Sequence, residues 1–317
     1  MLVYGGLKNN YKNMYIKNNK LLVKKIWNKE ISVLIDLNNL TEKDILRLTQ
    51  KEVFKIKEFE NYKNFEKNIY NKNILENIIF SSKLFLNLEE FKKNKKENIY
   101  FNLGFIEKFV YESNRAEWSK IKEEDLIKIF RNKKVNYQNK NEILEVKNSI
   151  KAFEFMQEKF IFNIWNIKKV YHILTKNLVM NSWDKYPRWF KKIENTVNDE
   201  ITSNPENVEK DIENLILWYK ENKNKLFPLE LAFIFHLKFQ KIHPFLDWNW
   251  RVGRFLLNKI LISNWYFPII IFSNNKKSFF NSIKTPWIWN KKYFKFMLEQ
   301  NKKTLTYFKK YETLPKT

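Results

Sequence analysis

Apolar residues recur at helical spacing along most of this chain. Leu231, Phe235 and Phe239 follow this spacing in a segment that begins at Pro228, and a second such segment runs on from Phe255. A short polar turn separates the two segments, so the local prediction is helix, turn, helix. The same pattern predicts helices over residues 123–130, 147–162, 163–180, 205–221 and 291–308. These segments predict a mainly α fold.

Short runs of β-type sequence interrupt the helical pattern in three places. Residues 20–27 and 30–37 predict a small N-terminal hairpin, and residues 267–272 predict a short apolar strand. Residues 181–197 form a break between helices with turn residues at both ends and a β-prone piece within. We expect residues 1–100 to form an N-terminal region with this short hairpin and helices, and residues 101–317 to form the main domain.

The candidate catalytic and binding residues lie in the polar turn between the helix that begins at Pro228 and the helix that runs on from Phe255. This turn reads His243-Pro-Phe-Leu-Asp-Trp-Asn-Trp-Arg-Val-Gly-Arg254. A helix that starts after such a turn presents unpaired backbone N–H groups and the positive end of its dipole, which suits phosphate. Arg251 and Arg254 would add donors, Asp247 could hold a divalent cation on the phosphates, and His243 could take a proton from a hydroxyl. The turn therefore predicts a nucleotide site.

At these residues the chain resembles the Fic (Fido) family, whose motif is His-x-Phe-x-Asp/Glu-Gly-Asn-Gly-Arg-x-x-Arg. The matching positions are His243, Phe245, Asp247, Asn249, Arg251 and Arg254. The resemblance implies a Fic-type helical bundle with a small β-hairpin flap. It also implies a protein adenylyltransferase that moves AMP from ATP to a Ser, Thr or Tyr hydroxyl, with His243 as base and Mg²⁺ on Asp247. The expected nucleotide contacts are Asp247, Trp248, Asn249, Trp250, Arg251, Val252, Gly253 and Arg254.

A second signature of the same family, Ser/Thr-x-x-x-Glu followed by Gly or Asn, resembles Ser113 to Trp118. The resemblance makes residues 108–118 an inhibitory helix in which Glu117 pairs with Arg254. An arginine engaged by a carboxylate cannot hold the γ-phosphate, so we expect autoinhibition by Glu117. The family also places the flap, here residues 188–203, where it docks an extended segment of the target protein.

Tryptophan stands at several positions where the resemblance expects glycine. Trp248 and Trp250 break the motif, and the further positions are Trp118, Trp265 and Trp289. The chain has 11 Trp and only 4 Gly in 317 residues, against an average glycine usage of about 7%. Our hypothesis is that UGA codons for glycine were translated as tryptophan. Trp218, on an apolar helix face, is interpreted as genuine.

Composition adds bounds on compartment and partners. The chain carries 59 basic and 35 acidic residues, a net charge of +24, but the bases are nearly all lysine, which does not favour a nucleic-acid partner. It has no cysteine and no apolar run long enough to cross a membrane, so we expect a cytoplasmic protein. His172 and His236 are interpreted as structural, the latter as a buried support for the site. A homo-oligomer stays open.

Two alternatives to an adenylyltransferase remain. If Trp248 and Trp250 are genuine, the chain would be a catalytically inactive Fic-like binding module. A transferase that uses UTP, GTP or CDP-choline as the donor is the other.

Overall fold

The computed structural model describes residues 14–17, 20–26, 29–32, 95–180, 184–197, 200–226, 228–264, 266–283 and 291–312. Side chains are described from residue 104 onward, apart from residues 291 and 309–312. The chain divides into two compact units, residues 1–66 and 67–317. Trp265 and Trp289 lie outside the described residues. So does the stretch from Thr41 to about residue 80, whose sequence predicts a helical start at Thr41. The domain boundary near residue 100 stays a prediction.

The first unit contains a three-stranded antiparallel sheet in the order β1-β2-β3. Its strands are β1 (Met14–Lys17), β2 (Lys20–Ile26) and β3 (Lys29–Ser32). Leu22 pairs with Tyr15 on one side, and Val23 pairs with Ile31 on the other. The predicted hairpin is therefore present as β2 and β3, and the sequence pattern missed the third strand, β1.

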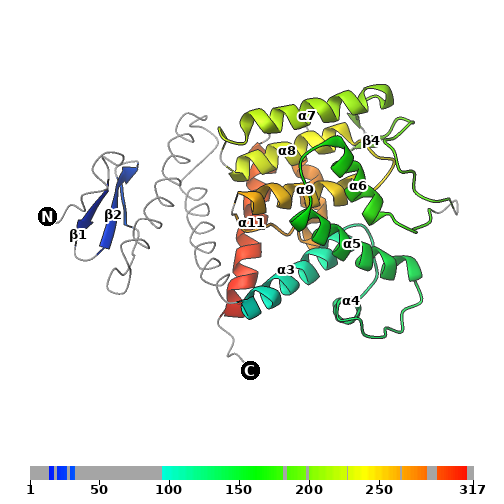
Figure 1. The fold of residues 1–317 in the computed structure, drawn as a ribbon, viewed down its shortest axis with the longest axis horizontal. Coiled ribbons are helices and arrows are strands. Elements are labelled where there is room, and N and C mark those ends of the chain that lie inside the picture. Colours follow the sequence, from blue (N-terminus) through cyan, green and yellow to red (C-terminus); the bar gives the residue numbers. More distant parts are fainter. Residues whose placement is uncertain are drawn as a thin grey trace. The chain divides into compact units, whose positions relative to one another are not determined.

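The second unit is built from helices. In chain order these are α3 (Lys95–Arg115), α4 (Glu123–Phe130), α5 (Lys140–Glu158), α6 (Ile164–Leu174), α7 (Val208–Asn222), α8 (Pro228–Ile242), α9 (Asn249–Ser263), α10 (Lys276–Ile283) and α11 (Lys291–Glu312), with short 3-10 turns at Pro205–Asn207 and Ser273–Asn275. In Figure 1 α7, α8 and α9 run side by side, and α3 lies along α5. The predicted mainly α fold is confirmed, and helix α4 has the predicted limits.

Helix α8 lies in the core of this unit, because nearly all its side chains are buried. His236 is fully buried, and its Nδ1 lies 2.6 Å from the hydroxyl of Tyr293 on α11. Burial lowers the pKa of His236 to about 3. Helix α9 packs closely against α8 at Gly253, where a Cβ would overlap with Nε2 of Gln240. The prediction that His236 is a buried, hydrogen-bonded residue is confirmed.

Residues 267–272, which were expected to form a strand, form none, although residues 266–271 are buried. Asn258 on α9 accepts from the backbone N–H of Ile269 at 2.8 Å and donates to its carbonyl at 3.0 Å. Thr304 of α11 accepts from the N–H of Ile270 at 3.0 Å. Side chains of two helices thus satisfy the backbone groups that a neighbouring strand would otherwise pair. The expectation of a strand was wrong for this reason.

The segment expected as a flap contains a small antiparallel hairpin of β4 (Thr196–Val197) and β5 (Glu200–Ile201). Ile201 is 73% exposed and Ile193, just before the hairpin, is 62% exposed.

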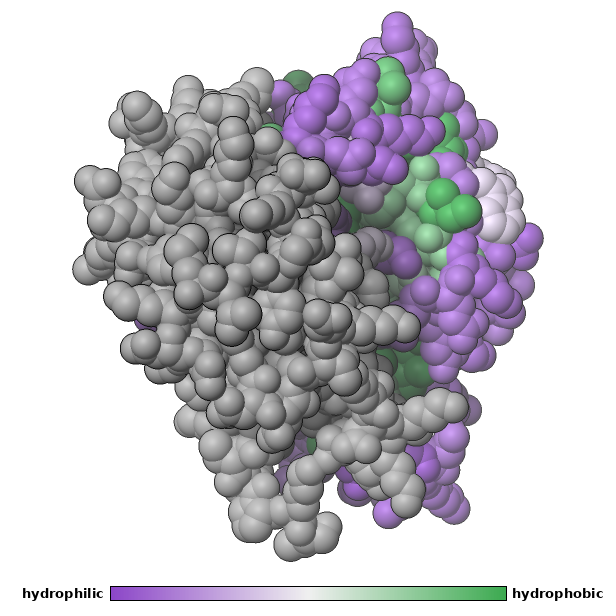
Figure 2. All heavy atoms as spheres, turned by 60° about the vertical axis from the view of Figure 1, so that its left-hand side comes forward, coloured by the Kyte–Doolittle hydropathy of each residue, from purple (hydrophilic) through white to green (hydrophobic). Residues whose placement is uncertain are grey.

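The face seen in Figure 2 is largely hydrophilic where the structure describes it, with hydrophobic side chains showing between the hydrophilic ones. Within the described residues, the helices are too short or too polar to span a membrane.

Candidate active site

The candidate site is built on the loop that joins α8 to α9. The side-chain oxygen of Asn249 accepts from the backbone N–H of Phe245, and its amide donates to the Phe245 carbonyl, both at 2.8 Å. The ring of Phe245 stacks on Tyr171 of α6 at 4.0 Å between centroids. These contacts fold the loop over the first turn of α9, whose leading N–H groups lack intrahelical partners. Asn249 is 1% exposed, so its side chain shapes the loop, and a contact with phosphate stays a prediction.

His243 begins this loop in a left-handed backbone conformation, with φ of +49°. Its side chain is largely buried, and Nδ1 lies 3.3 Å from the carbonyl oxygen of Gln240. A carbonyl can only accept, so Nδ1 carries the proton and Nε2 keeps its lone pair. Burial lowers the pKa of His243 to about 4, and the nearby Lys191 contributes in the same direction. The imidazole is therefore neutral near pH 7 and available as a proton acceptor.

Ser113, Glu117 and Arg254 come together as the sequence predicts. The Nη2 of Arg254 donates to Oε1 of Glu117 at 2.8 Å and to the Ser113 carbonyl at 3.1 Å, while Nε donates to Oγ of Ser113 at 2.9 Å. Burial raises the pKa of Glu117, but the guanidinium groups of Arg254 and Arg251 outweigh it and hold the pKa below its ordinary value. Glu117 is thus ionised and holds a buried arginine.

The residue after Glu117 sits where a helix ordinarily ends in glycine. Ser119 donates its N–H to the carbonyl of Asn114 at 3.1 Å, and Trp118 donates to Arg115 at 3.2 Å. This is the Schellman pair of bonds, which places Trp118 at the position that adopts the left-handed conformation. Its φ is +71°, and its indole is 81% exposed. The local backbone therefore favours glycine at 118.

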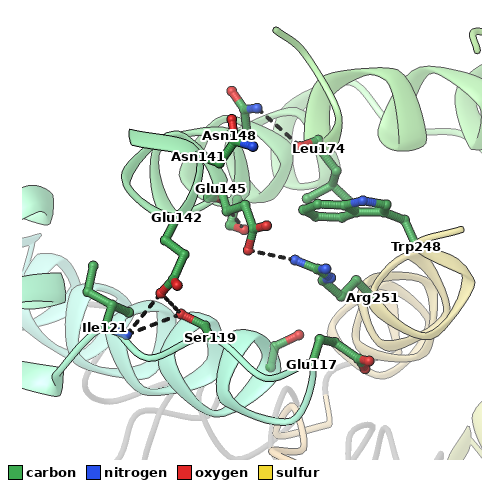
Figure 3. Close-up of polar contacts among 12 residues, drawn as sticks. Glu117, Ser119, Ile121, Asn141, Glu142, Glu145, Asn148, Leu174, Trp248 and Arg251 are labelled. Atoms are coloured by element: carbon green, nitrogen blue, oxygen red, sulfur yellow. Dashed lines mark hydrogen bonds and ion pairs between the residues drawn. The ribbon is translucent and has the colours of Figure 1, made fainter. Parts of the chain in front are cut away.

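Trp248 occupies a second left-handed position, with φ of +69° directly before α9. Its indole is 3% exposed and lies over the guanidinium of Arg251, 3.3 Å from the ring centroid, as Figure 3 shows. The buried indole N–H has no hydrogen-bond partner in the described part of the chain. None of the described glycines has a positive φ, whereas two tryptophans do.

Arg251 is held by a carboxylate that the sequence did not reveal. Its Nη1 donates to Oε2 of Glu145 on α5 at 2.8 Å (Figure 3). One turn earlier, Glu142 accepts from Oγ of Ser119 at 2.5 Å and from the N–H of Ile121 at 3.0 Å. The first turns of α5 thus fix both Arg251 and the chain that follows Glu117.

The sequence pattern placed the start of this helix at residue 147, seven residues late. The missed signal is the cap at its true start, where the Asn139 side chain accepts from the N–H of Glu142 at 3.2 Å. An Asn followed three residues later by Glu is a sign of a helix start. The helix predicted over 163–180 instead ends at Leu174, where Asn148 of α5 donates to its carbonyl.

Asp247 lies exposed at the edge of the loop. Its Oδ1 accepts from the N–H of Trp248 at 2.6 Å, and Oδ2 is 3.4 Å from the hydroxyl of Tyr186. No cluster of three or more metal-ligating side chains occurs in the described part of the chain. A single exposed carboxylate with one weakly engaged oxygen fits a Mg²⁺ ion held mainly by phosphates and water.

The pocket beside these residues is small. It has a volume of about 10 Å³ and is lined by Ala116, Glu117, Trp250, Arg254, Ile271, Phe272, Lys276, Phe279 and Phe280. The ring of Trp250 packs against His243 at 5.9 Å and against Phe279 at 5.1 Å. Small-molecule sites ordinarily measure about 300–1,000 Å³. With an indole at 250, the pocket does not fit a nucleoside triphosphate.

Residues 162–261, which contain this loop, match the model of the Fic/DOC family. This part of the chain is therefore similar to a Fic domain. The curated relatives include Protein adenylyltransferase Fic of Drosophila grimshawi, which is 36% identical over 64 residues, and that of Nematostella vectensis, 37% identical over 76 residues. These segments cover 20% and 24% of this chain but only 13% and 18% of the two relatives.

Solved structures support the assignment of the fold. A Fic-domain signaling protein from Bacteroides thetaiotaomicron aligns with a TM-score of 0.62 at 20% identity, covering 72% of this chain and 94% of that one. A Fic family protein from Desulfovibrio desulfuricans aligns with a TM-score of 0.64 at 17% identity, covering 78% and 77%. A segment of Fic-1 from C. elegans aligns with a TM-score of 0.58 at 15% identity, covering 85% and 74%. The Fic-type helical bundle is thereby established.

The site residues fall into two groups. The loop brings His243, Asp247 and the first turn of α9 together. Glu117 reaches Arg254 from the turn that follows α3, because this helix ends at Arg115 and not at residue 118 as expected. Glu145 lies 106 positions before Arg251 in the sequence, so no local pattern could link them. His172 on α6 stands outside this arrangement and is half-buried.

Proposed function

We propose that this chain, with glycine at positions 248 and 250, is a protein adenylyltransferase that moves AMP from ATP to a side-chain hydroxyl. The observation that carries the proposal is the neutral imidazole of His243 beside the first turn of α9, in contact with Trp250, which lines the pocket together with Arg254. Glycine at 250 would remove the indole that packs on His243 and give the pocket room for nucleotide. Glycine at 248 would relieve a left-handed backbone.

In the proposed transfer step, His243 acts on the target hydroxyl, and Arg251 and the first turn of α9 act on the leaving group. The target hydroxyl oxygen attacks the α-phosphorus of ATP while Nε2 of His243 takes the hydroxyl proton. The bond from the α-phosphorus to the bridging oxygen breaks, and its electrons leave with pyrophosphate. Arg251 and the backbone N–H groups of residues 248–253 stabilise the charge that develops on that leaving group. Mg²⁺, held by Asp247, would neutralise phosphate charge when bound.

In this proposal Glu117 keeps the enzyme inactive. Its carboxylate occupies Nη2 of Arg254, a donor that would otherwise hold the γ-phosphate. The hairpin β4–β5 would present the target, because two exposed isoleucines, Ile193 and Ile201, and a short strand edge suit an extended peptide.

One observation favours a second candidate function. If Trp250 is genuine, its contacts with His243 and Phe279 leave a pocket of only about 10 Å³, and the chain would be a catalytically silent binding module. The codons at 248 and 250 separate the two candidates, since UGG at both would establish genuine tryptophan.

The experiment uses full-length protein carrying Trp248→Gly and Trp250→Gly, with and without Glu117→Gly, incubated with Mg²⁺ and α-labelled ATP, UTP, GTP or CDP-choline. We expect label on protein from ATP, and only in the Glu117→Gly form. Glu124→Gly, an exposed glutamate on α4, is the matched control for Glu117 and should leave the protein inactive. His243→Ala should abolish labelling, and His172→Ala should not. If none of the donors labels protein, the transferase proposal fails.

A further inference from the structure

Lys191 is a buried lysine next to the His243 loop, and neither the motif nor the flap prediction gave it a role. Its side chain is 3% exposed. The ammonium Nζ donates to Oδ1 of Asn195 at 2.6 Å, to Oγ1 of Thr202 at 2.5 Å and to the carbonyl of Ile242 at 3.4 Å. Within the described residues it forms no ion pair with a carboxylate. All three donors of the ammonium are therefore used on neutral oxygens.

These bonds enclose the candidate base from both sides. The Lys191 ammonium donates to the carbonyl of Ile242, the last residue of α8. The Lys191 backbone N–H donates to the carbonyl of Pro244 at 2.8 Å. One residue thus contacts the carbonyls immediately before and after His243. Asn195 adds a third bond, from its amide to the carbonyl of Phe245 at 3.1 Å. The stretch before the hairpin covers consecutive polar groups of the loop.

Such a tether has a physical purpose at His243, whose φ of +49° is uncommon for a residue with a side chain. A strained backbone of this kind persists only where its surroundings over-determine it, at a cost of roughly 1–3 kcal/mol. Asn249 fixes the far end of the loop from α9, as described above. The contacts of Lys191 fix the near end.

We propose that Lys191 is a positioning residue, which holds the His243 loop against the flap segment and keeps the imidazole in place for proton transfer. This inference rests on the proposed function only for its catalytic meaning; the tether itself does not. The charged groups whose effects reach the imidazole are Lys191 from the flap and Glu117 from the end of α3. Glu194 and Asp211 act on the ammonium of Lys191, whose pKa burial lowers to about 8.

The test is a titration of His243 that needs no catalysis. The chain has only three histidines, so in histidine-labelled protein the His243 signal can be assigned by its loss in His243→Ala. Lys191→Met removes a nearby positive charge and releases the loop toward water, and both changes favour the imidazolium. We therefore expect the His243 pKa measured by NMR to rise in Lys191→Met and to stay near the native value in Lys191→Arg.

Lys192→Met is the matched control, because Lys192 is the exposed neighbour and its ammonium lies over the Trp189 ring at 5.4 Å. It should leave the titration unchanged. If Lys191→Met does not fold, Lys191→Gln supplies the uncharged variant with its donors retained. An unchanged His243 pKa in the uncharged variant, or a shift equal to that in Lys192→Met, would overturn the proposal.

A second readout ties the tether to the reaction. In the glycine-substituted, Glu117→Gly protein, Lys191→Met should lower kcat by roughly 10- to 100-fold, move the acid limb of the pH profile upward and leave KM for ATP unchanged. If Lys191→Met raises the His243 pKa but no protein is labelled, the proposed function fails and the positioning role stands. If label is transferred but Lys191→Met changes neither the His243 pKa nor the pH profile, the positioning role fails and the proposed function stands.

Discussion

The left-handed turn at residue 118 allows the glycine hypothesis to be tested by stability alone. Trp118 has φ of +71° at the end of α3, and its indole is 81% exposed. Replacing it with glycine also removes the contact of Lys276 with the ring, 4.2 Å from the centroid. Comparing Trp118→Gly with Trp118→Ala cancels that loss, because neither variant keeps the ring.

The difference between the two variants follows from the backbone. A left-handed conformation costs an L-residue roughly 1–2 kcal/mol, whereas glycine loses about 0.5–1 kcal/mol more chain entropy than alanine on folding. Glycine should therefore be more stable than alanine at 118 by roughly 0.5–1 kcal/mol. At Trp218, inside α7 (Val208–Asn222), the order should reverse, with glycine less stable by about 1 kcal/mol.

Thermal unfolding followed by circular dichroism measures both differences. A change of 1 kcal/mol shifts Tm by roughly 2–4 °C in a protein of about 150–250 residues. The reversal of sign between positions 118 and 218 is the decisive outcome. An alanine variant at 118 that melts at or above the glycine variant would refute the argument from the turn.

Three further predictions concern the packing around the site. Gly253→Ala would place a Cβ against Gln240 of α8 and should destabilise the fold by roughly 1–3 kcal/mol. Gly104→Ala in α3, where a Cβ would have nothing within 4 Å, should stabilise the fold slightly. Thermal unfolding compares the two variants. Glu145→Gln would leave Arg251 without its part-buried carboxylate and should cost roughly 1.5–3 kcal/mol, measured by urea unfolding. The buried His236 has a pKa of about 3, so between pH 6.5 and 4 it is protonated only in the unfolded chain. The free energy of unfolding should therefore decrease as the pH is lowered, by up to about 1.4 kcal/mol per pH unit. His236→Asn should reduce this slope.

Much of the helical part could be predicted because its pattern is local. Helices α8 and α9 show their apolar faces in sequence, and Pro228 marks the first residue of α8. Residues 267–272 have the composition of a strand, but the partners of their backbone are side chains on α9 and α11, which no local pattern reveals.

The same limit applies to the site. His243, Asp247 and the first turn of α9 lie within one short stretch, so their proximity follows from the sequence. The contacts of Glu145 with Arg251 and of Lys191 with Ile242 join residues 106 and 51 positions apart, and only the folded chain brings them together. At Trp118 the sequence shows only a tryptophan where glycine was expected. The φ of +71° in the structure gives the physical reason why glycine suits this position.

The network around Glu142 limits how the contact between Glu117 and Arg254, which we propose to be inhibitory, can be released. Three donors on residues 119–121 converge on that carboxylate, so the chain just past Glu117 cannot swing outward without breaking all of them. Glu117 itself reaches Arg254 through a single side-chain bond and is about one-fifth exposed. We therefore expect activation to act on that one carboxylate, through a rotamer change or a competing anion, with the helix end staying where it is.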